Sequence, residues 1–314
     1  MGIFGATLNQ AAFLFLLIVV GYVLAKWKFV PDNGHTVLSK LENYIFVPAL
    51  VMGTFIKNFT VQILGTAWKM LLGSLILNLT MIGISLLFAR LLEKKRYDRN
   101  ICLFGLCFSN FGFMGNAVVS ALFPEIFMEY LLFTLPLWSL IYMWGVPALL
   151  LGDEGQKPTL AQRLKSFLNP MFIGMILGML IGILQIPLPS FIQTAIGVAG
   201  DCMSPIAMLL TGMTVAHFDL GAILKIKSVY WATFLRLIIY PALFLVVLYF
   251  VPMPKTFALC GACALAMPAG LTPVIIPGAM GKDTRLASSF ALVSHGLCCL
   301  TIPLVMLAAQ WIIG

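Results

Sequence analysis

Charged residues are scarce in this sequence, and acidic ones are the scarcest. Only 10% of the 314 residues are charged, with 11 Asp and Glu against 19 Lys and Arg, whereas a soluble domain carries about 25% charged residues. Histidine occurs three times, and the chain holds no HExxH motif, no phosphate-binding loop and no Ser–His–Asp set at a common depth. These shortages exclude an ordinary soluble domain, and they argue against an enzyme, which would need clustered carboxylates or histidines.

Long apolar runs occupy the chain instead. Hydrophobic residues make up 61% of it, and a membrane-spanning helix needs about 20 consecutive apolar residues. Runs of that length recur from end to end with short polar breaks, so we expect an all-α integral membrane protein with ten transmembrane helices. The expected spans are 9–29, 34–56, 64–91, 100–123, 127–151, 168–187, 190–216, 222–251, 255–280 and 285–312.

The basic residues divide unevenly between the two sides of the membrane. Fifteen of the 19 Lys and Arg lie in or beside the loops that follow the odd-numbered spans, whereas the opposite side holds Lys57, Lys69 and Lys255. Because cytoplasmic loops collect Lys and Arg, this pattern predicts a multi-pass plasma-membrane protein with both termini outside. The topology also accounts for the net charge of +8, so we expect no nucleic-acid partner.

The cysteines give no sign of a metal or a disulfide framework. All seven fall within expected spans, which indicates free thiols packed as small apolar side chains. Cys260 and Cys263 have C-x-x-C spacing, but no second pair and no neighbouring histidine accompany them. We therefore expect no metal site.

The second half of the chain repeats the spacing of the first. A displacement of about 157 residues carries the first five spans onto the last five, for example 64–91 onto 222–251. Because each unit has an odd number of helices, the second enters the membrane from the opposite side, and such inverted repeats are typical of secondary transporters. The expected units are a first five-helix repeat at 1–152, a cytoplasmic linker at 153–167 and a second, inverted repeat at 168–314.

Two of the expected spans are interrupted at equivalent positions, by SNFGFMGN at 109–116 and by MPAGLTP at 267–273. Proline and glycine unwind a helix there, and freed backbone groups are tolerated only in a protein interior or a watery cavity. If the breaks face each other, the half-helices after them present N-terminal amides to one point, suited to a carboxylate. The alternative is close helix packing with ordinary kinks. The candidate substrate-binding residues are Asn110, Gly112, Asn116, Pro268, Gly270, Thr272 and Pro273, with Arg236 as a candidate counter-charge.

Four ionisable side chains fall at membrane depth, where each is a functional candidate. Arg236 can pair with a substrate carboxylate or, in an internal ion pair, with Asp201. Glu42 lies near the inner end of its span, from which it could also extend to the interface. His295 is either a proton relay or a satisfied core histidine. We take Asp201, Glu42 and His295 as candidates for binding a coupling Na⁺ or H⁺, and we expect no other cofactor.

Several segments together resemble the auxin efflux carrier family, which contains plant PIN proteins and bacterial malate and malonate permeases. They include ALAMPAGLTPVIIPGAM in the ninth span, GDCMSPIAMLLTGMTVA in the seventh and NPMFIGMILGMLIGILQIPLP in the sixth. The resemblance spans nearly the full length. It implies two inverted five-helix repeats with broken, crossing helices 4 and 9, a bile-acid-symporter/NhaA-like architecture. It further implies a scaffold bundle from helices 1, 2, 6 and 7, and a crossing bundle from helices 3–5 and 8–10.

Two positions depart from the family's pattern. Many members have a proline two residues after the helix 4 glycine, whereas this chain continues Gly115, Asn116, Ala117. Asn116 therefore either meets the substrate or caps the second half-helix. Plant members have an acidic residue four positions before a helix 3 lysine, whereas this chain has Gly65 before Lys69, which weakens a proton-linked role for that pair.

The resemblance implies a function as well as a fold. The expected activity is secondary transport of small organic anions, such as malate, malonate or auxin-like acids, by alternating access at a site near the membrane midplane. A sodium-coupled bile-acid-type symporter is the alternative, and a membrane-embedded enzyme is a more distant one. The expected partners are a small carboxylate substrate, membrane lipid and, in a homodimer, a second copy of the chain.

Overall fold

The computed structural model describes residues 3–59, 61–151, 170–217, 221, 225–279 and 281–313, and this part of the chain is helical without any β-strand. Five helices in it are long and apolar enough to cross a membrane, and they coincide with expected spans three, five, seven, eight and ten. They are Ala67–Leu92, Pro124–Leu150, Ser190–Ala216, Lys227–Phe250 and Arg285–Ile313. The all-helical architecture is thereby confirmed, and five helices of spanning length agree with a multi-pass membrane protein, while the count of ten spans stays a prediction. The predicted linker at 153–167 lies outside the described residues.

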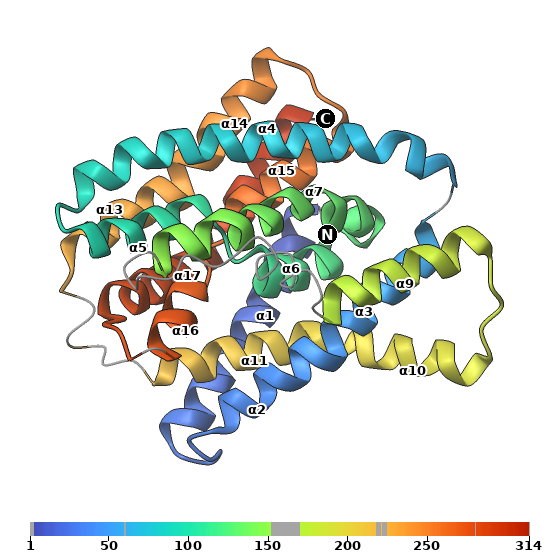
Figure 1. Ribbon diagram of the computed structural model, residues 1–314, viewed down its shortest axis with the longest axis horizontal. Helices are drawn as coiled ribbons and strands as arrows, with labels where there is room; N and C mark the ends of the chain where they lie inside the picture. Colours follow the sequence, from blue (N-terminus) through green and yellow to red (C-terminus); the bar gives the residue numbers. More distant parts are fainter. Residues whose placement is uncertain are drawn as a thin grey trace.

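One set of helices, which we call the scaffold bundle, holds the N-terminal segment against the middle of the chain. In it α1 packs along α11, and α3 packs against α9 and α10; most of these helices lie in the lower half of Figure 1. Its members are α1 (Ile3–Lys26), α2 (Gly34–Leu41), η1 (Glu42–Phe46), α3 (Val47–Asn58), α9 (Pro170–Leu184), α10 (Ser190–Asp201) and α11 (Met203–Ala216).

Glycines set the close approach of α3 and α9 within the scaffold bundle. Gly174, Gly178 and Gly182 are spaced by four residues, so they line one face of α9. A Cβ atom added at Gly178 would lie 2.7 Å from the carbonyl oxygen of Met52 in α3. Between membrane helices the apolar side chains gain little over lipid, so close backbone contact of this kind supplies much of the association.

The second set of helices, which we call the crossing bundle, contains most of the buried core. The longest, α4, runs for 32 residues without a proline and ends where the polar run EKKR begins at 93–96; it crosses the upper part of Figure 1, below the end of α14. The members are α4 (Val61–Leu92), α5 (Arg96–Cys107), η2 (Phe111–Gly115), α6 (Asn116–Leu122), η3 (Pro124–Ile126), α7 (Phe127–Leu140), η4 (Ile141–Leu150), α13 (Lys227–Phe234), η5 (Leu235–Ile239), α14 (Tyr240–Phe250), α15 (Lys255–Ala266), α16 (Thr272–Ala279) and α17 (Arg285–Ile313).

The two faces of α4 differ in burial. Ser74 and Ser85 are fully buried on the side toward the other helices of the crossing bundle, whereas Leu72, Ile76 and Leu87 are exposed on the outer side. A row of exposed large apolar residues along one face is expected where lipid, rather than water, surrounds the protein.

Candidate functional site

The two interrupted helices meet at their breaks. The break between α5 and η2 lies antiparallel to the break between α15 and α16, with Ser109 bridged to Ala269. The amide of Asn110 donates to the carbonyl of Pro268 at 2.8 Å, and the amide of Gly270 donates to the carbonyl of Phe108 at 3.1 Å. Each unwound segment therefore supplies hydrogen-bond partners that the other has lost, which is what backbone at membrane depth requires.

The approach of the two breaks leaves little room for a side chain at position 270. A Cβ atom there would lie 3.3 Å from the carbonyl oxygen of Phe108 and 3.4 Å from that of Ser109. Both neighbours are backbone atoms already held in the bridge, so they cannot move aside as a side chain can. On the far side, the amide of Ala269 donates to Oγ of Ser294 at 3.2 Å, which attaches the break to α17.

A cavity of about 390 Å³ lies beside these breaks and is called the crossing cavity below. Four predicted site residues line it, namely Asn110, Gly112, Gly270 and Thr272. The scaffold bundle supplies the facing wall. That wall consists of Asn43, Tyr44, Val47, Pro170 and Met171, and the aromatic residues Trp138 and Tyr142 of α7 and η4 also line the cavity. The volume falls within the roughly 300–1,000 Å³ common for small-molecule sites.

The crossing cavity thus lies where two broken membrane helices meet, between two bundles. Residues 6–306 match the family model described as membrane transport protein. The chain belongs to this family. It is the auxin efflux carrier family, so the resemblance predicted from the sequence is confirmed and the protein is a membrane transporter. A search of curated proteins found no match.

Arg236 of this transporter is buried beside the crossing, where its guanidinium group donates hydrogen bonds to backbone carbonyls. Its Nε donates to the carbonyl of Met267 at 3.2 Å, Nη1 to that of Leu106 at 3.3 Å and Nη2 to that of Ala264 at 3.2 Å. These carbonyls lie at the C-terminal ends of α5 and α15, where the helix dipole favours a positive charge. Arg236 therefore ties the two first half-helices together.

The sequence prediction for Arg236 needs correction in this respect. Neither a substrate-facing position nor a pair with Asp201 agrees with the geometry, because Arg236 does not line the crossing cavity and Asp201 is exposed at the C-terminal end of α10. The reason is that α5 and α15 both end at this point, and their carbonyls are closer partners than any side chain. Sequence distance concealed them, since Leu106 precedes Arg236 by 130 residues.

Asn110 is the polar side chain at the centre of the site, and it bonds to His295. The side-chain amide nitrogen of Asn110 lies 2.9 Å from Nε2 of His295, and Nδ1 of His295 lies 2.7 Å from the carbonyl oxygen of Ala291. Asn110 is 4% exposed and His295 3%. The sequence indicated Asn110 as a substrate-binding candidate and His295 as a proton or coupling-ion candidate but not that they touch, since 185 positions separate them.

The remaining predicted substrate residues lie around the crossing without lining the cavity. Pro268 contributes its carbonyl to the bridge, and Pro273 is buried at the start of α16. Asn116 is the first residue of α6 and makes no capping hydrogen bond, so the alternative that it caps the half-helix is wrong. Its Oδ1 is buried without a partner within the described residues, and Asn116 lines a second cavity of about 20 Å³ together with Thr134.

Glu42 is fully buried in η1, and neither carboxylate oxygen has a hydrogen-bond partner among the described residues. It does not extend to the interface, which corrects that alternative. Glu42 lies next to Asn43 and Tyr44 in the chain, and these two residues line the crossing cavity. An unpaired carboxyl group in such surroundings is strongly disfavoured in its charged form.

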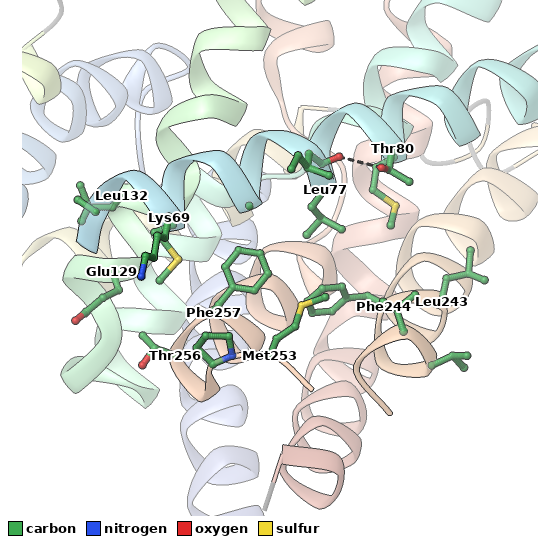
Figure 2. Close-up of a pocket in the computed structure, with 18 of the residues that line it drawn as sticks. Lys69, Leu77, Thr80, Glu129, Leu132, Leu243, Phe244, Met253, Thr256 and Phe257 are labelled. Carbon is green, nitrogen blue, oxygen red and sulfur yellow. Dashed lines mark hydrogen bonds between the residues drawn. The ribbon is translucent and has the colours of Figure 1, made fainter. Parts of the chain in front are cut away.

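A larger cavity of about 960 Å³, called the apolar groove below, lies on the other side of the crossing bundle. Figure 2 shows Leu77 and Thr80 of α4 above it, Leu243 and Phe244 of α14 at one end, and Phe257 of α15 within it. Its polar lining residues are Lys69, Glu129 and Thr256, at the end away from Leu243, and Thr80 at the edge formed by α4. None of the residues at the helix breaks lines it.

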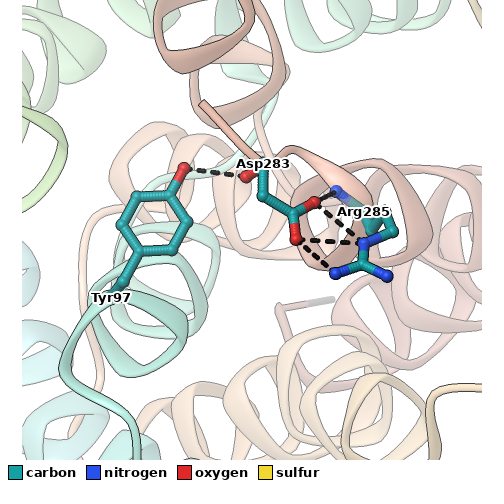
Figure 3. Close-up of polar contacts among 3 residues, drawn as sticks. All are labelled: Tyr97, Asp283 and Arg285. Atoms are coloured by element: carbon teal, nitrogen blue, oxygen red, sulfur yellow. Dashed lines mark hydrogen bonds and ion pairs between the residues drawn. The ribbon is translucent and has the colours of Figure 1, made fainter. Parts of the chain in front are cut away.

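A polar cluster outside the apolar region joins the starts of α5 and α17. The hydroxyl of Tyr97 donates to the carbonyl of Asp283 at 2.8 Å, and the Asp283 carboxylate accepts hydrogen bonds from the Arg285 guanidinium (Figure 3). The hydrogen bonds from Arg285 lower the pKa of the Asp283 carboxyl group below its usual value. Because the pair is largely exposed, it contributes little to stability.

Several lining residues escaped the sequence prediction. Asn43, Tyr44, Trp138, Tyr142 and Met171 lie on helices outside the breaks, and ordinary polar and aromatic residues within apolar spans carry no distinctive signal. No group of three or more His, Cys, Asp or Glu within the described residues lies close enough to hold a metal ion.

Proposed function

We propose that this protein is a secondary transporter of small organic anions, namely carboxylates such as malate, malonate or auxin-like acids. The observation that carries the proposal is the hydrogen-bonded pairing of two helix breaks beside a cavity that both bundles line. Irregular backbone at membrane depth marks the binding sites of many secondary transporters. In this proposal the carboxylate binds in the crossing cavity beside Asn110, Gly112, Gly270 and Thr272.

The chemistry of the cavity lining suits an anion. None of the described residues that line it is charged, so no carboxylate side chain repels the substrate. The half-helices that begin at Phe111 and Thr272 direct their first-turn amides toward the breaks, and such amides carry partial positive charge. The side-chain amide of Asn110 and the hydroxyl of Thr272 add hydrogen-bonding groups, while Tyr44 and Tyr142 provide flat apolar faces for an organic substrate.

The position of the cavity between two bundles supports alternating access. If the crossing bundle moves against the scaffold bundle, the cavity wall formed by Asn43, Tyr44 and Met171 separates from the breaks and opens the site to one side. The inverted five-helix repeats, the outer location of both termini and the plasma-membrane location belong to this proposal, as does a homodimer in lipid. No cofactor is required beyond a coupling Na⁺ or H⁺.

Uptake by reconstituted protein tests the proposal. Liposomes that contain the purified protein should accumulate radiolabelled malate, malonate or indole-3-acetate. Asn110→Ala should weaken the apparent affinity at least tenfold, or about 1.4 kcal/mol, because it removes a central polar group of the cavity. Asn58→Ala is a matched control, since Asn58 is exposed at the end of α3, and its affinity should stay within about twofold.

Two outcomes would contradict the proposal: no carboxylate enters the wild-type liposomes, or Asn110→Ala transports with the wild-type affinity. The same assay with and without a sodium gradient separates the two carrier types. A strict requirement for sodium would favour a bile-acid-type symporter, whereas uptake in its absence favours a proton-coupled or uncoupled carrier.

A further inference from the structure

The hydrogen bonds around His295 define the position of its proton. Nδ1 lies 2.7 Å from the carbonyl oxygen of Ala291, and a carbonyl can only accept, so Nδ1 carries a hydrogen. In a neutral imidazole the other nitrogen is then an acceptor. Nε2 of His295 therefore accepts from the Asn110 amide group at 2.9 Å.

This tautomer fixes the orientation of the Asn110 amide. Its nitrogen faces His295, so its carbonyl oxygen Oδ1 occupies the other branch of the side chain. Oδ1 accepts no hydrogen bond from the described residues, and Asn110 lines the crossing cavity. With neutral His295, Asn110 therefore directs an acceptor toward a site that must bind an anion.

Protonation of His295 reverses this arrangement. A proton from cavity water would add to the Nε2 lone pair, forming an N–H bond as an O–H bond of hydronium breaks. Both imidazole nitrogens are then donors, and Nε2–H needs an acceptor. A half-turn of the Asn110 amide supplies Oδ1 to His295 and turns the two N–H donors toward the cavity.

The surroundings of His295 link this protonation to the anion. The buried titratable groups on the described helices that pack against α17 are Cys102 and Cys107 in α5, Arg236 in η5, Tyr240 in α14, and Cys260 and Cys263 in α15, with Cys298 on α17 itself. None of them is a carboxyl group, and Arg236 is already positive. A buried imidazolium there has no counter-charge among them, and isolated buried charge is costly. A bound carboxylate would supply that counter-charge.

We propose that His295 is a protonatable positioning residue that turns the Asn110 amide from acceptor to donor, so that a carboxylate and one proton bind to the transporter together. This inference rests on the proposed function and names its coupling ion. By linkage, an anion that raises the proton affinity of His295 is itself bound more tightly by the same factor when His295 is protonated.

Calorimetry tests the proposal directly. Malonate is titrated into purified wild-type protein in lipid nanodiscs at several pH values between 6 and 8, in two buffers of different ionisation enthalpy. Wild type should take up close to one proton per malonate, and its affinity should fall up to about tenfold per pH unit as pH rises. In His295→Gln the side-chain amide still meets Asn110 but does not titrate, so the proton uptake assigned to His295 and the matching pH dependence should vanish.

His217→Gln serves as the control, because His217 is exposed beyond the end of α11; it should keep the wild-type proton uptake. Titration of malonate itself is common to all three proteins and cancels between them. Equal proton uptake by wild type and His295→Gln would overturn the proposal and leave carboxylate transport intact, as would malonate binding by wild type without proton uptake. That second readout needs no variant to fold. If wild type binds none of the three ligands malonate, malate and indole-3-acetate, the proposed function fails and this inference fails with it.

Discussion

The apolar groove is larger than the crossing cavity, but the lining of the crossing cavity is more polar. The groove encloses about 960 Å³ between α4, α14 and α15, while the crossing cavity encloses about 390 Å³. Yet the groove is lined mainly by Leu, Ile, Val, Phe and Met side chains and contains no residue of the helix breaks. The crossing cavity is lined by two helix breaks, by amide side chains and by aromatic residues from both bundles.

The difference shows that the capacity to recognise a polar solute comes from converging polar groups rather than from volume. In the groove, the backbone amides and carbonyls of α4 are paired within the helix, and its apolar side chains match the acyl chains of lipid. At the crossing, the breaks leave backbone groups that need hydrogen-bond partners. Arg236 and Ser294 bond to such backbone groups, and His295 bonds to the side chain of Asn110. The two breaks therefore bring polar groups together around the middle of the crossing cavity, whereas the polar side chains of the groove lie at its end and edge.

The largest effect should come from Arg236→Met, which breaks the crossing. It leaves three buried carbonyls without their donor, and each buried polar group left unsatisfied costs about 1–3 kcal/mol. Thermal unfolding in detergent, followed by tryptophan fluorescence, should show a large drop in melting temperature, with Arg236→Lys intermediate because it keeps the charge but not the planar set of donors. A variant that melts like wild type but no longer binds carboxylates would restore the counter-charge interpretation.

A smaller effect is expected from Gly270→Ala, which changes the crossing by one methyl group. The new Cβ would press on the carbonyl oxygens of Phe108 and Ser109, and overpacking of this kind costs about 1–3 kcal/mol. Gly83→Ala on the groove helix α4 is the matched control, since a Cβ there would meet no atom within 4 Å apart from its own stretch of helix. The melting temperature should fall for Gly270→Ala and stay level or rise for Gly83→Ala. Equal melting temperatures would show that the two breaks are not in close contact.

The smallest effect is expected in the groove itself. Leu243→Trp adds a bulky ring to a half-exposed position in the groove wall, but it changes no residue that lines the crossing cavity. Malonate affinity, measured by calorimetry, should therefore stay within about twofold of wild type, as for surface changes away from a site. A tenfold loss would place the substrate in the groove and reverse the comparison.

Local chemistry made part of the site predictable. Proline and glycine disrupt a helix within one turn, so the breaks around Asn110 and Pro268 follow from the sequence without knowledge of the fold. Four of the predicted residues, Asn110, Gly112, Gly270 and Thr272, indeed line the crossing cavity. The roles given to Arg236 were wrong, because burial of a charge in an apolar span indicates that it has partners but not which ones.

The sequence by itself determined that the chain belongs in a membrane, that its helices are long and apolar, and that two of them are broken. Those properties depend on residues within about one turn of helix or on the mean polarity of a span, which are local quantities. Only the tertiary structure decided that the breaks pair, that Arg236 bonds to Leu106 and Met267, and that His295 meets Asn110. These contacts join residues 31 to 185 positions apart, and they depend on how whole helices pack, which no local pattern records.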